Sequence, residues 1–194
     1  MTEGDGSIVR WLEESGALRK GHFLLSAGGH STAYVQCALL LEQPRRAEKV
    51  GQLLASRLRP YEPEAVVSPA LGGLIIGYEV ARSLNIPFRF SERNKGTMTL
   101  RRGFSLQPRE RIAIVEDVVT TGKSTLEVAA LVQGSGATLC AVGSILDRTV
   151  AADNPFTVPF ESLLELELPT FRPEDCPLCS QGVAIDQPGS RRNS

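Results

Sequence analysis

The stretch that most constrains this chain runs from Arg111 to Thr125 and reads RIAIVEDVVTTGKST. Its apolar run, IAIV, leads directly into two adjacent carboxylates, Glu116 and Asp117. Such a run is typical of a strand covered on both faces, as in a parallel sheet. The hydroxyl-rich turn that follows leads into a helix-like segment, whose first N–H groups can bind a phosphate. We therefore expect a ligand site at the carboxyl end of this strand, where open α/β sheets place their sites.

The two halves of this stretch favour different chemical groups. The turn favours an anion, whereas the two acids repel anions and accept hydrogen bonds from hydroxyl groups. A ribose carrying a 5-phosphate satisfies both halves, although a polar turn without a ligand remains the alternative. The end of the turn also resembles a nucleotide P-loop, but that motif has a glycine five residues before its second glycine. Here that position is Asp117, which excludes the P-loop.

Composition and charge exclude several classes of protein. A chain of 194 residues is long enough to bury a sizeable core and is most simply one domain. Its 21 basic and 22 acidic residues give a net charge of −1, so we expect no nucleic-acid partner. We also expect no membrane span and no signal peptide. Cys37 and Cys140 lie alone in apolar surroundings, which predicts reduced thiols and a cytoplasmic protein.

Hydrophobic periodicity predicts helices that alternate with strands. This alternation favours a parallel sheet with right-handed crossovers. The predicted helices cover Ser7–Ser15, Pro44–Leu58, Leu74–Leu84 and Ser124–Gln133. The predicted strands are two short ones within Ala17–Leu41, then Ala65–Val67, Ile86–Phe90, the apolar run described above and Thr138–Leu146.

A second strand-to-helix turn covers Ser68–Gly73. Gly72 and Gly73 have no β-carbon to block a ligand, and the start of the following helix offers free N–H groups. This turn therefore suits a diphosphate, although paired glycines before a helix also occur in tight turns that bind nothing.

The segment from Ser91 to Gly103 is polar and cationic, with Arg93, Lys95, Arg101 and Arg102 among few apolar residues. Taken alone, it predicts a solvated basic hairpin. Arg148 follows the strand that ends near Asp147, so its guanidinium should reach the same sheet edge as the first turn. Arginine suits bidentate recognition of a carboxylate or of a planar base edge, with a surface ion pair as the alternative.

The C-terminal tail, from Pro169, contains the pair Cys176 and Cys179. A structural zinc site would need a second pair of Cys or His ligands. The remaining candidates are not spaced as a pair: His22, His30, Cys37 and Cys140. The sequence therefore predicts no metal ligand, and a tail that packs against the domain without metal.

Together these segments resemble the type I phosphoribosyltransferases, and within them the orotate phosphoribosyltransferase family. The resemblance covers nearly the whole chain. Its pieces are Gly21–Leu25, His30-Ser31, Ser68–Gly73, Leu100–Phe104, Glu116–Gly122, Asp147-Arg148, Cys176–Cys179 and Pro188–Arg191.

The resemblance implies an α/β fold in which a central, mostly parallel sheet is flanked by helices under a small N-terminal hood. It implies one phosphoribosyltransferase domain over residues 1–194. The hood would cover about 1–42 with part of the C-terminal tail, and the core about 43–150. Family members are dimers in which the segment equivalent to Ser91–Gly103 is a mobile lid that reaches the neighbouring site, so a homodimer is expected.

The resemblance also implies an activity: transfer of the 5-phosphoribosyl group from phosphoribosyl diphosphate (PRPP) to N1 of orotate. Arg93 and Lys95 of the lid would be catalytic, because fixed cations stabilise the charge on departing pyrophosphate. Thr120 and Arg148 would contact orotate. PRPP would be bound by Gly72, Gly73, Glu116, Asp117, Val118, Val119, Thr120, Thr121, Gly122, Lys123 and Ser124. Mg²⁺ would be held mostly by substrate oxygens and water, so no protein ligand is assigned to it.

Two departures from the family pattern are visible. The lid holds no histidine, and the early loop, Ser26–Gly29, lacks the lysine that approaches orotate in some members. The rival enzyme hypothesis is a phosphoribosyltransferase for a purine base or uracil. A non-catalytic PRPP-binding regulator is the rival from another class, although the chain has no added nucleic-acid-binding module.

Overall fold

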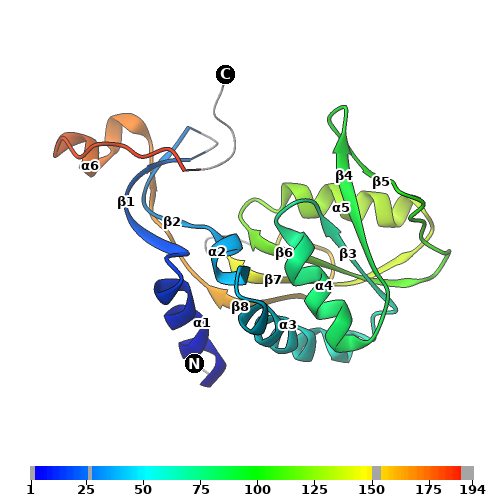
Figure 1. The fold of residues 1–194 in the computed structure, drawn as a ribbon. Coiled ribbons are helices and arrows are strands. Elements are labelled where there is room, and N and C mark those ends of the chain that lie inside the picture. The colour runs from blue at the N-terminus through cyan, green and yellow to red at the C-terminus, as the bar shows by residue number, and fades with distance from the viewer. Residues whose placement is uncertain (1–2, 26–27, 150–153, 189–194) are drawn as a thin grey trace.

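The computed structural model describes residues 3–25, 28–149 and 154–188 and contains two sheets of different size (Figure 1). The larger is six-stranded, in the order β5-β4-β3-β6-β7-β8, and the smaller is three-stranded, in the order β1-β2-β9. The predicted α/β architecture with a mostly parallel sheet is confirmed, since among the described strands of the larger sheet only β4 and β5 pair antiparallel. Among the described residues, no helix combines the length and the apolar character that crossing a membrane requires.

Helices cover both faces of the larger sheet. Alternate residues of β6 (Arg111–Val119) enter two different core clusters, because successive side chains of a strand point to opposite faces. Ala113 and Val115 pack with α3 (Pro44–Leu58) and α4 (Gly73–Leu84), whereas Ile112 and Ile114 pack with α5 (Lys123–Gly134). The other strands are β3 (Ala65–Pro69), β4 (Phe88–Asn94), β5 (Thr97–Leu100), β7 (Thr138–Asp147) and β8 (Phe160–Glu165).

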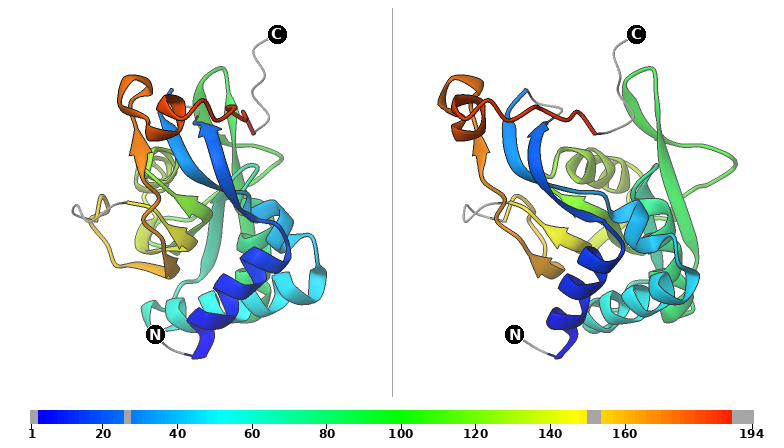
Figure 2. Two further views of the ribbon diagram at one scale, coloured as in Figure 1. Left: turned by 90° about the vertical axis from the view of Figure 1, so that its left-hand side faces the viewer. Right: turned by 60° about the vertical axis from the view of Figure 1, so that its left-hand side comes forward.

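The smaller sheet forms a hood beside the carboxyl ends of the core strands. It comprises β1 (Leu18–Leu24), β2 (His30–Val35) and β9 (Thr170–Phe171), with α1 (Glu3–Glu14) below it. The C-terminal segment, which includes α6 (Pro177–Ser180), crosses the ends of β1 and β2 (Figure 2). The hood is therefore built from both ends of the chain.

Some elements have the predicted bounds and others do not. The predicted helix Pro44–Leu58 is found with those bounds, but Cys37–Leu41 forms the short helix α2 instead of strand, since a short apolar run does not distinguish the two. The strand expected over Ile86–Phe90 begins at Phe88 and continues into the lid as β4. The sheet continues past residue 150, the expected end of the core, because β8 pairs in parallel with β7. Part of the early loop, Ser26 and Ala27, lies outside the described residues.

Candidate active site

The two acids lie within β6 and point to opposite faces of the sheet. Glu116 pairs in register with Ser144 of β7 and accepts a hydrogen bond of 2.6 Å from the Thr125 hydroxyl of α5. Asp117 Oδ1 accepts a hydrogen bond of 2.9 Å from the backbone N–H of Val118. β6 thus continues past the two acids to Val119, and the two carboxylates accept hydrogen bonds from different groups.

Both acids are largely withdrawn from water. Burial raises the pKa of Glu116 to about 7, against the lowering effect of the Thr125 hydrogen bond, and Asp117 raises it further. Burial also raises the pKa of Asp117, while the Val118 N–H lowers it. A buried carboxylate without a cationic partner is destabilising, so this arrangement is typical of a binding site that a ligand completes.

The turn after β6 surrounds a cavity of about 60 Å³. Gly122 caps α5 with a φ of +70°, a conformation that favours glycine, and Leu126 N–H donates to its carbonyl. The N-cap residue, Gly122, offers no side-chain cap, and the Lys123 N–H makes only a long hydrogen bond of 3.4 Å to the Thr121 hydroxyl, so the first N–H groups of α5 can turn to an anion. Of the eleven residues predicted to bind PRPP, Gly72, Gly73 and Asp117 do not line the cavity, and the other eight do: Glu116, Val118, Val119, Thr120, Thr121, Gly122, Lys123 and Ser124.

The second predicted turn lies directly against β6, the strand that precedes the first turn. A β-carbon at Gly72 would come within 2.5 Å of Asp117 Oδ1, and one at Gly73 within 2.9 Å of the Val115 carbonyl. Gly72 and Gly73 start α4, which has no side-chain cap either. The loop between β3 and α4 and the strand β6 therefore share one site, and both glycines are needed for the close approach.

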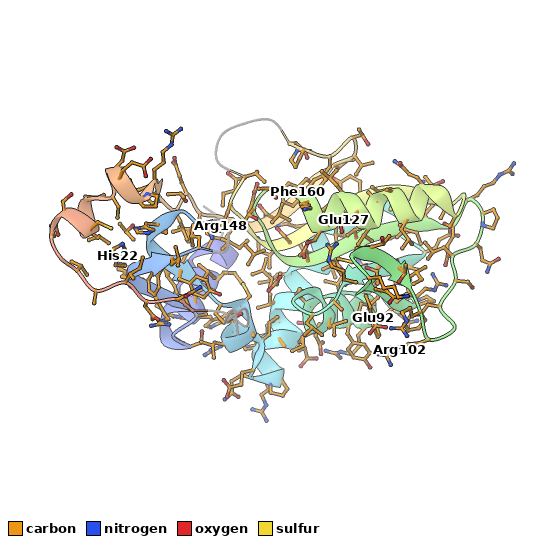
Figure 3. The ribbon with its side chains drawn as sticks, turned by 90° about the horizontal axis from the view of Figure 1, so that it is seen from above. His22, Glu92, Arg102, Glu127, Arg148 and Phe160 are labelled. Atoms are coloured by element: carbon orange, nitrogen blue, oxygen red, sulfur yellow. The ribbon has the colours of Figure 1, made fainter. Side chains whose placement is uncertain are left out.

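Arg148 lies between the hood and the core sheet (Figure 3). Its backbone N–H donates to the Val119 carbonyl at 2.8 Å, which ties it to the end of β6. Its Nε is buried and has no hydrogen-bond partner among the described residues. Burial lowers the pKa of this guanidinium, and the phenol of Tyr34 opposes that shift. A half-buried, incompletely paired guanidinium is well suited to an anionic ligand.

Tyr34 of β2 is a site residue that the sequence did not reveal. Its pKa is raised first by burial and then by Asp117, whereas Arg148 lowers it. The hood therefore brings a phenol near one acid of the first turn and near the predicted base-binding arginine. This proximity arises from the position of the hood over the core sheet. Tyr34 belongs to no sequence motif, so the sequence alone does not identify it as a site residue.

The lid is the hairpin of β4 and β5, paired from Ser91↔Leu100 to Asn94↔Thr97. Arg93 forms an ion pair of 2.5 Å with Glu127 of α5 and donates to the Gly96 carbonyl. Lys95 is exposed at the hairpin turn, with a φ of +48°. Arg102 pairs with Glu92 within the hairpin at 2.8 Å (Figure 3). Arg93 is thus linked to α5, the helix that follows the turn after β6.

Comparison with known proteins agrees with this geometry. Residues 38–156 match the phosphoribosyl transferase domain family. The orotate phosphoribosyltransferase of Thermotoga maritima is 54% identical over 184 residues, which cover 95% of this chain and 98% of that protein. The chain belongs to the orotate phosphoribosyltransferase family.

Solved structures show the same fold. The orotate phosphoribosyltransferase from Aeropyrum pernix superimposes with a TM-score of 0.70 at 24% identity, covering 82% of this chain and 93% of that one. An adenine phosphoribosyltransferase from Trypanosoma brucei, in complex with AMP, pyrophosphate and ribose-5-phosphate, gives 0.63 at 20% identity, with coverage of 84% and 80%. Orotate and adenine phosphoribosyltransferases thus share this fold, and the base must be argued from side chains.

Proposed function

We propose that this member of the orotate phosphoribosyltransferase family transfers the 5-phosphoribosyl group of PRPP to N1 of orotate. The products are orotidine 5-monophosphate and pyrophosphate, on the route to UMP. The observation that carries the proposal is Arg148, a half-buried guanidinium whose buried Nε has no hydrogen-bond partner among the described residues. Orotate carries a carboxylate, which adenine, hypoxanthine and uracil lack, and a carboxylate is the group that a guanidinium binds best.

The remaining site residues divide between the two parts of PRPP. The turn Thr120–Ser124 and the first N–H groups of α5 hold the 5-phosphate, and Glu116 and Asp117 accept hydrogen bonds from ribose hydroxyls. Because the two acids point to opposite faces of β6, they contact different parts of the bound substrate. Gly72 and Gly73 let the diphosphate approach the start of α4.

In the proposed reaction, the bond between the anomeric carbon and the diphosphate oxygen breaks as N1 of orotate bonds to that carbon and releases its proton. The transition state resembles an oxocarbenium ion, and negative charge develops on pyrophosphate. Arg93 and Lys95 stabilise that charge when the lid closes, and closure excludes water that would hydrolyse the activated sugar. Thr120 adds a contact to orotate beside Arg148.

We propose Mg²⁺ as the cofactor, bound mainly through substrate oxygens and water. The side chains here fit this mode, because the described residues of this site include no group of three or more potential metal ligands. Two half-buried carboxylates nevertheless give the site negative charge that suits a hydrated cation. When bound, Mg²⁺ neutralises charge on the diphosphate.

We also propose a cytoplasmic homodimer. Leu71, Ile75 and Tyr78 are exposed around the start of α4, with Leu71 82% exposed, and an apolar patch of this kind favours burial against a second copy. All four cysteines are free, which fits a reducing compartment. Sedimentation of the protein at several concentrations tests the dimer.

The decisive experiment mixes the protein with Mg²⁺, PRPP and one base at a time and follows pyrophosphate release. We expect release with orotate alone. Release with uracil or hypoxanthine instead would refute the assignment. Binding of PRPP without turnover of any base would favour a non-catalytic regulator.

A further inference from the structure

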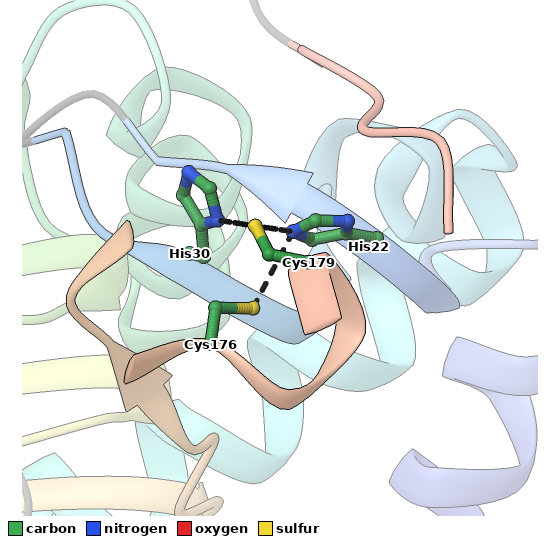
Figure 4. A group of neighbouring side chains, drawn as sticks. All are labelled: His22, His30, Cys176 and Cys179. Atoms are coloured by element: carbon green, nitrogen blue, oxygen red, sulfur yellow. Dashed lines mark hydrogen bonds between the residues drawn. The ribbon is translucent and has the colours of Figure 1, made fainter. Parts of the chain in front are cut away.

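Four side chains that the proposed reaction does not use converge in the hood (Figure 4). His22 lies on β1, His30 begins β2, and Cys176 and Cys179 lie at the start of α6 and within it. One ligand atom from each lies within 4.8 Å of every other. Among the described residues, no other group of three or more potential ligands is brought together in this way.

The spacing of these atoms is close to that of a tetrahedral metal site. His22 Nε2 lies 3.0 Å from His30 Nδ1, 3.5 Å from Cys176 Sγ and 3.7 Å from Cys179 Sγ, and Cys179 Sγ lies 3.2 Å from His30 Nδ1. Zinc–nitrogen and zinc–sulfur bonds at tetrahedral angles separate two nitrogens by about 3.4 Å, and a nitrogen from a sulfur by about 3.6 Å. The four distances above each differ from these values by at most 0.4 Å, and the remaining two are within 4.8 Å, so modest side-chain shifts would place all four atoms around one ion.

The hydrogen bonding of His22 directs a lone pair at the centre of the cluster. Its Nδ1 lies 2.8 Å from the Val183 carbonyl, which can only accept, so Nδ1 carries the proton. Nε2 of the neutral ring is then unprotonated and faces the other three ligand atoms. Metal-binding histidines typically donate their second ring N–H to a carbonyl or carboxylate in this way, which fixes the tautomer and the ring orientation.

The surroundings suit a closed, structural site. His22, His30 and Cys176 are buried, whereas Cys179 is exposed and leaves a path by which an ion can enter. Two thiols and two imidazoles complete a four-coordinate shell and leave no open position for a substrate. Ligands of this softness and number, at tetrahedral spacing, favour Zn²⁺ over Mg²⁺ or Ca²⁺.

The hairpin and the tail are also joined by an ion pair of 2.7 Å between Arg19 and Asp186, a hydrogen bond from the Ser31 hydroxyl to the Pro169 carbonyl and short stretches of backbone pairing. β9 pairs with β2 through only two residue pairs, His30↔Phe171 and Ser31↔Thr170. Beyond α6, Asp186 exchanges backbone hydrogen bonds with His22 and Leu24. A metal bound by both segments would cross-link the β1–β2 hairpin to the C-terminal tail, so its binding energy would add directly to the stability of the hood.

We propose that His22, His30, Cys176 and Cys179 bind one structural Zn²⁺ that joins the hairpin to the tail. Binding converts the two thiols to thiolates and releases their two protons, with no change of oxidation state. The proposal does not depend on which base the enzyme uses. It replaces the sequence-based expectation of a tail that packs without metal.

The test measures metal content and coordination in the full-length protein. After expression with added zinc and purification in reducing buffer without chelators, we expect about one Zn²⁺ per chain by elemental analysis. Cys176→Ser and Cys179→Ser should lose most of this zinc. Cys140→Ser is the matched control, because that thiol lies on β7 outside the cluster, and it should keep zinc at the wild-type level.

Cobalt substitution tests the ligand set even where a variant folds poorly. Wild-type protein loaded with Co²⁺ should show the visible bands of a tetrahedral site and a near-ultraviolet charge-transfer band from thiolate. The milder variant Cys179→Ser, at the exposed position, should weaken the charge-transfer band, and Cys140→Ser should not. A chelator should lower the unfolding temperature of the wild type and of Cys140→Ser, and leave that of Cys179→Ser unchanged.

Three outcomes would overturn the proposal. The first is wild-type protein with reduced thiols that takes up neither Zn²⁺ nor Co²⁺. The second is equal zinc loss in Cys140→Ser and Cys179→Ser. The third is a disulfide between Cys176 and Cys179 that persists in reducing buffer, which would show that these thiols pair with each other and not with a metal.

Discussion

The backbone of Gly72 lies directly against the carboxylate of Asp117, and the space between them is too small for a side chain at position 72. A β-carbon at position 72 would fall 2.5 Å from Oδ1 and 2.8 Å from Oδ2. The contact joins the start of α4 to β6, and hence the proposed diphosphate loop to the proposed ribose site. The glycine acts here through its size, since its φ of −56° is open to any residue.

Gly72→Ala should therefore impair substrate binding more than folding. The new methyl group meets the end of a side chain that can rotate, so the chain folds while Asp117 is displaced from its position. We expect kcat/KM for PRPP to fall by about 10- to 100-fold, as small displacements in active sites do. Gly134→Ala is the control, because a β-carbon there meets nothing within 4 Å. Equal kinetics of the two variants would contradict the role given to this contact.

Arg148→Gln should weaken the use of orotate and leave the KM for PRPP unchanged. A hydrogen bond to a charged group contributes about 1.5–3 kcal/mol, so kcat/KM for orotate should fall roughly 10- to 150-fold, mainly through KM. Steady-state kinetics with each substrate varied in turn measures the effect. Arg59→Gln, at an exposed arginine just after α3, should change neither KM. Unchanged use of orotate by Arg148→Gln would remove the observation on which the base assignment rests.

From the sequence we could propose only those parts of the candidate site that are contiguous in the chain. The turn after β6 and the pair Gly72 and Gly73 could be proposed because strand, loop and helix follow one another within a few residues. Tyr34 could not be found in this way, since its role arises from the position of the hood. The cluster of His22, His30, Cys176 and Cys179 in the hood was not predicted for the same reason. His22 and His30 are eight positions apart and meet only because β1 and β2 pair antiparallel.

The ion pair between Arg93 and Glu127 permits a test of the lid. If Arg93 stabilises departing pyrophosphate, Arg93→Ala should lower kcat by roughly 30- to 1,000-fold, the range for a lost transition-state contact of 2–4 kcal/mol. Glu127→Gln should change kcat by less than about 5-fold, because a partly exposed ion pair contributes at most about 1 kcal/mol. Equal, small effects of both variants would show that Arg93 only anchors the hairpin to α5.

Glu116 should make the folded protein less stable as pH rises. Its pKa is raised to about 7 by burial, above the 4.5 of an unperturbed glutamate. Between these two values the folded chain keeps a proton that the unfolded chain has lost, so stability falls as pH rises through this window and then levels off. Glu116→Gln mimics the protonated form at every pH and should escape this loss.

We therefore expect Glu116→Gln to unfold at a higher temperature than the wild type at pH 8, and at nearly the same temperature at pH 4.5. The shift in pKa corresponds to a difference on the order of 3 kcal/mol. Thermal unfolding of both proteins at both pH values measures it, and Glu13→Gln, at an exposed position of α1, is the control. Glu116→Gln should also lose activity, because an amide replaces the carboxylate that accepts hydrogen bonds from ribose. A variant less stable than the wild type at pH 8 would show that Glu116 is needed for folding and that its burial serves no ligand.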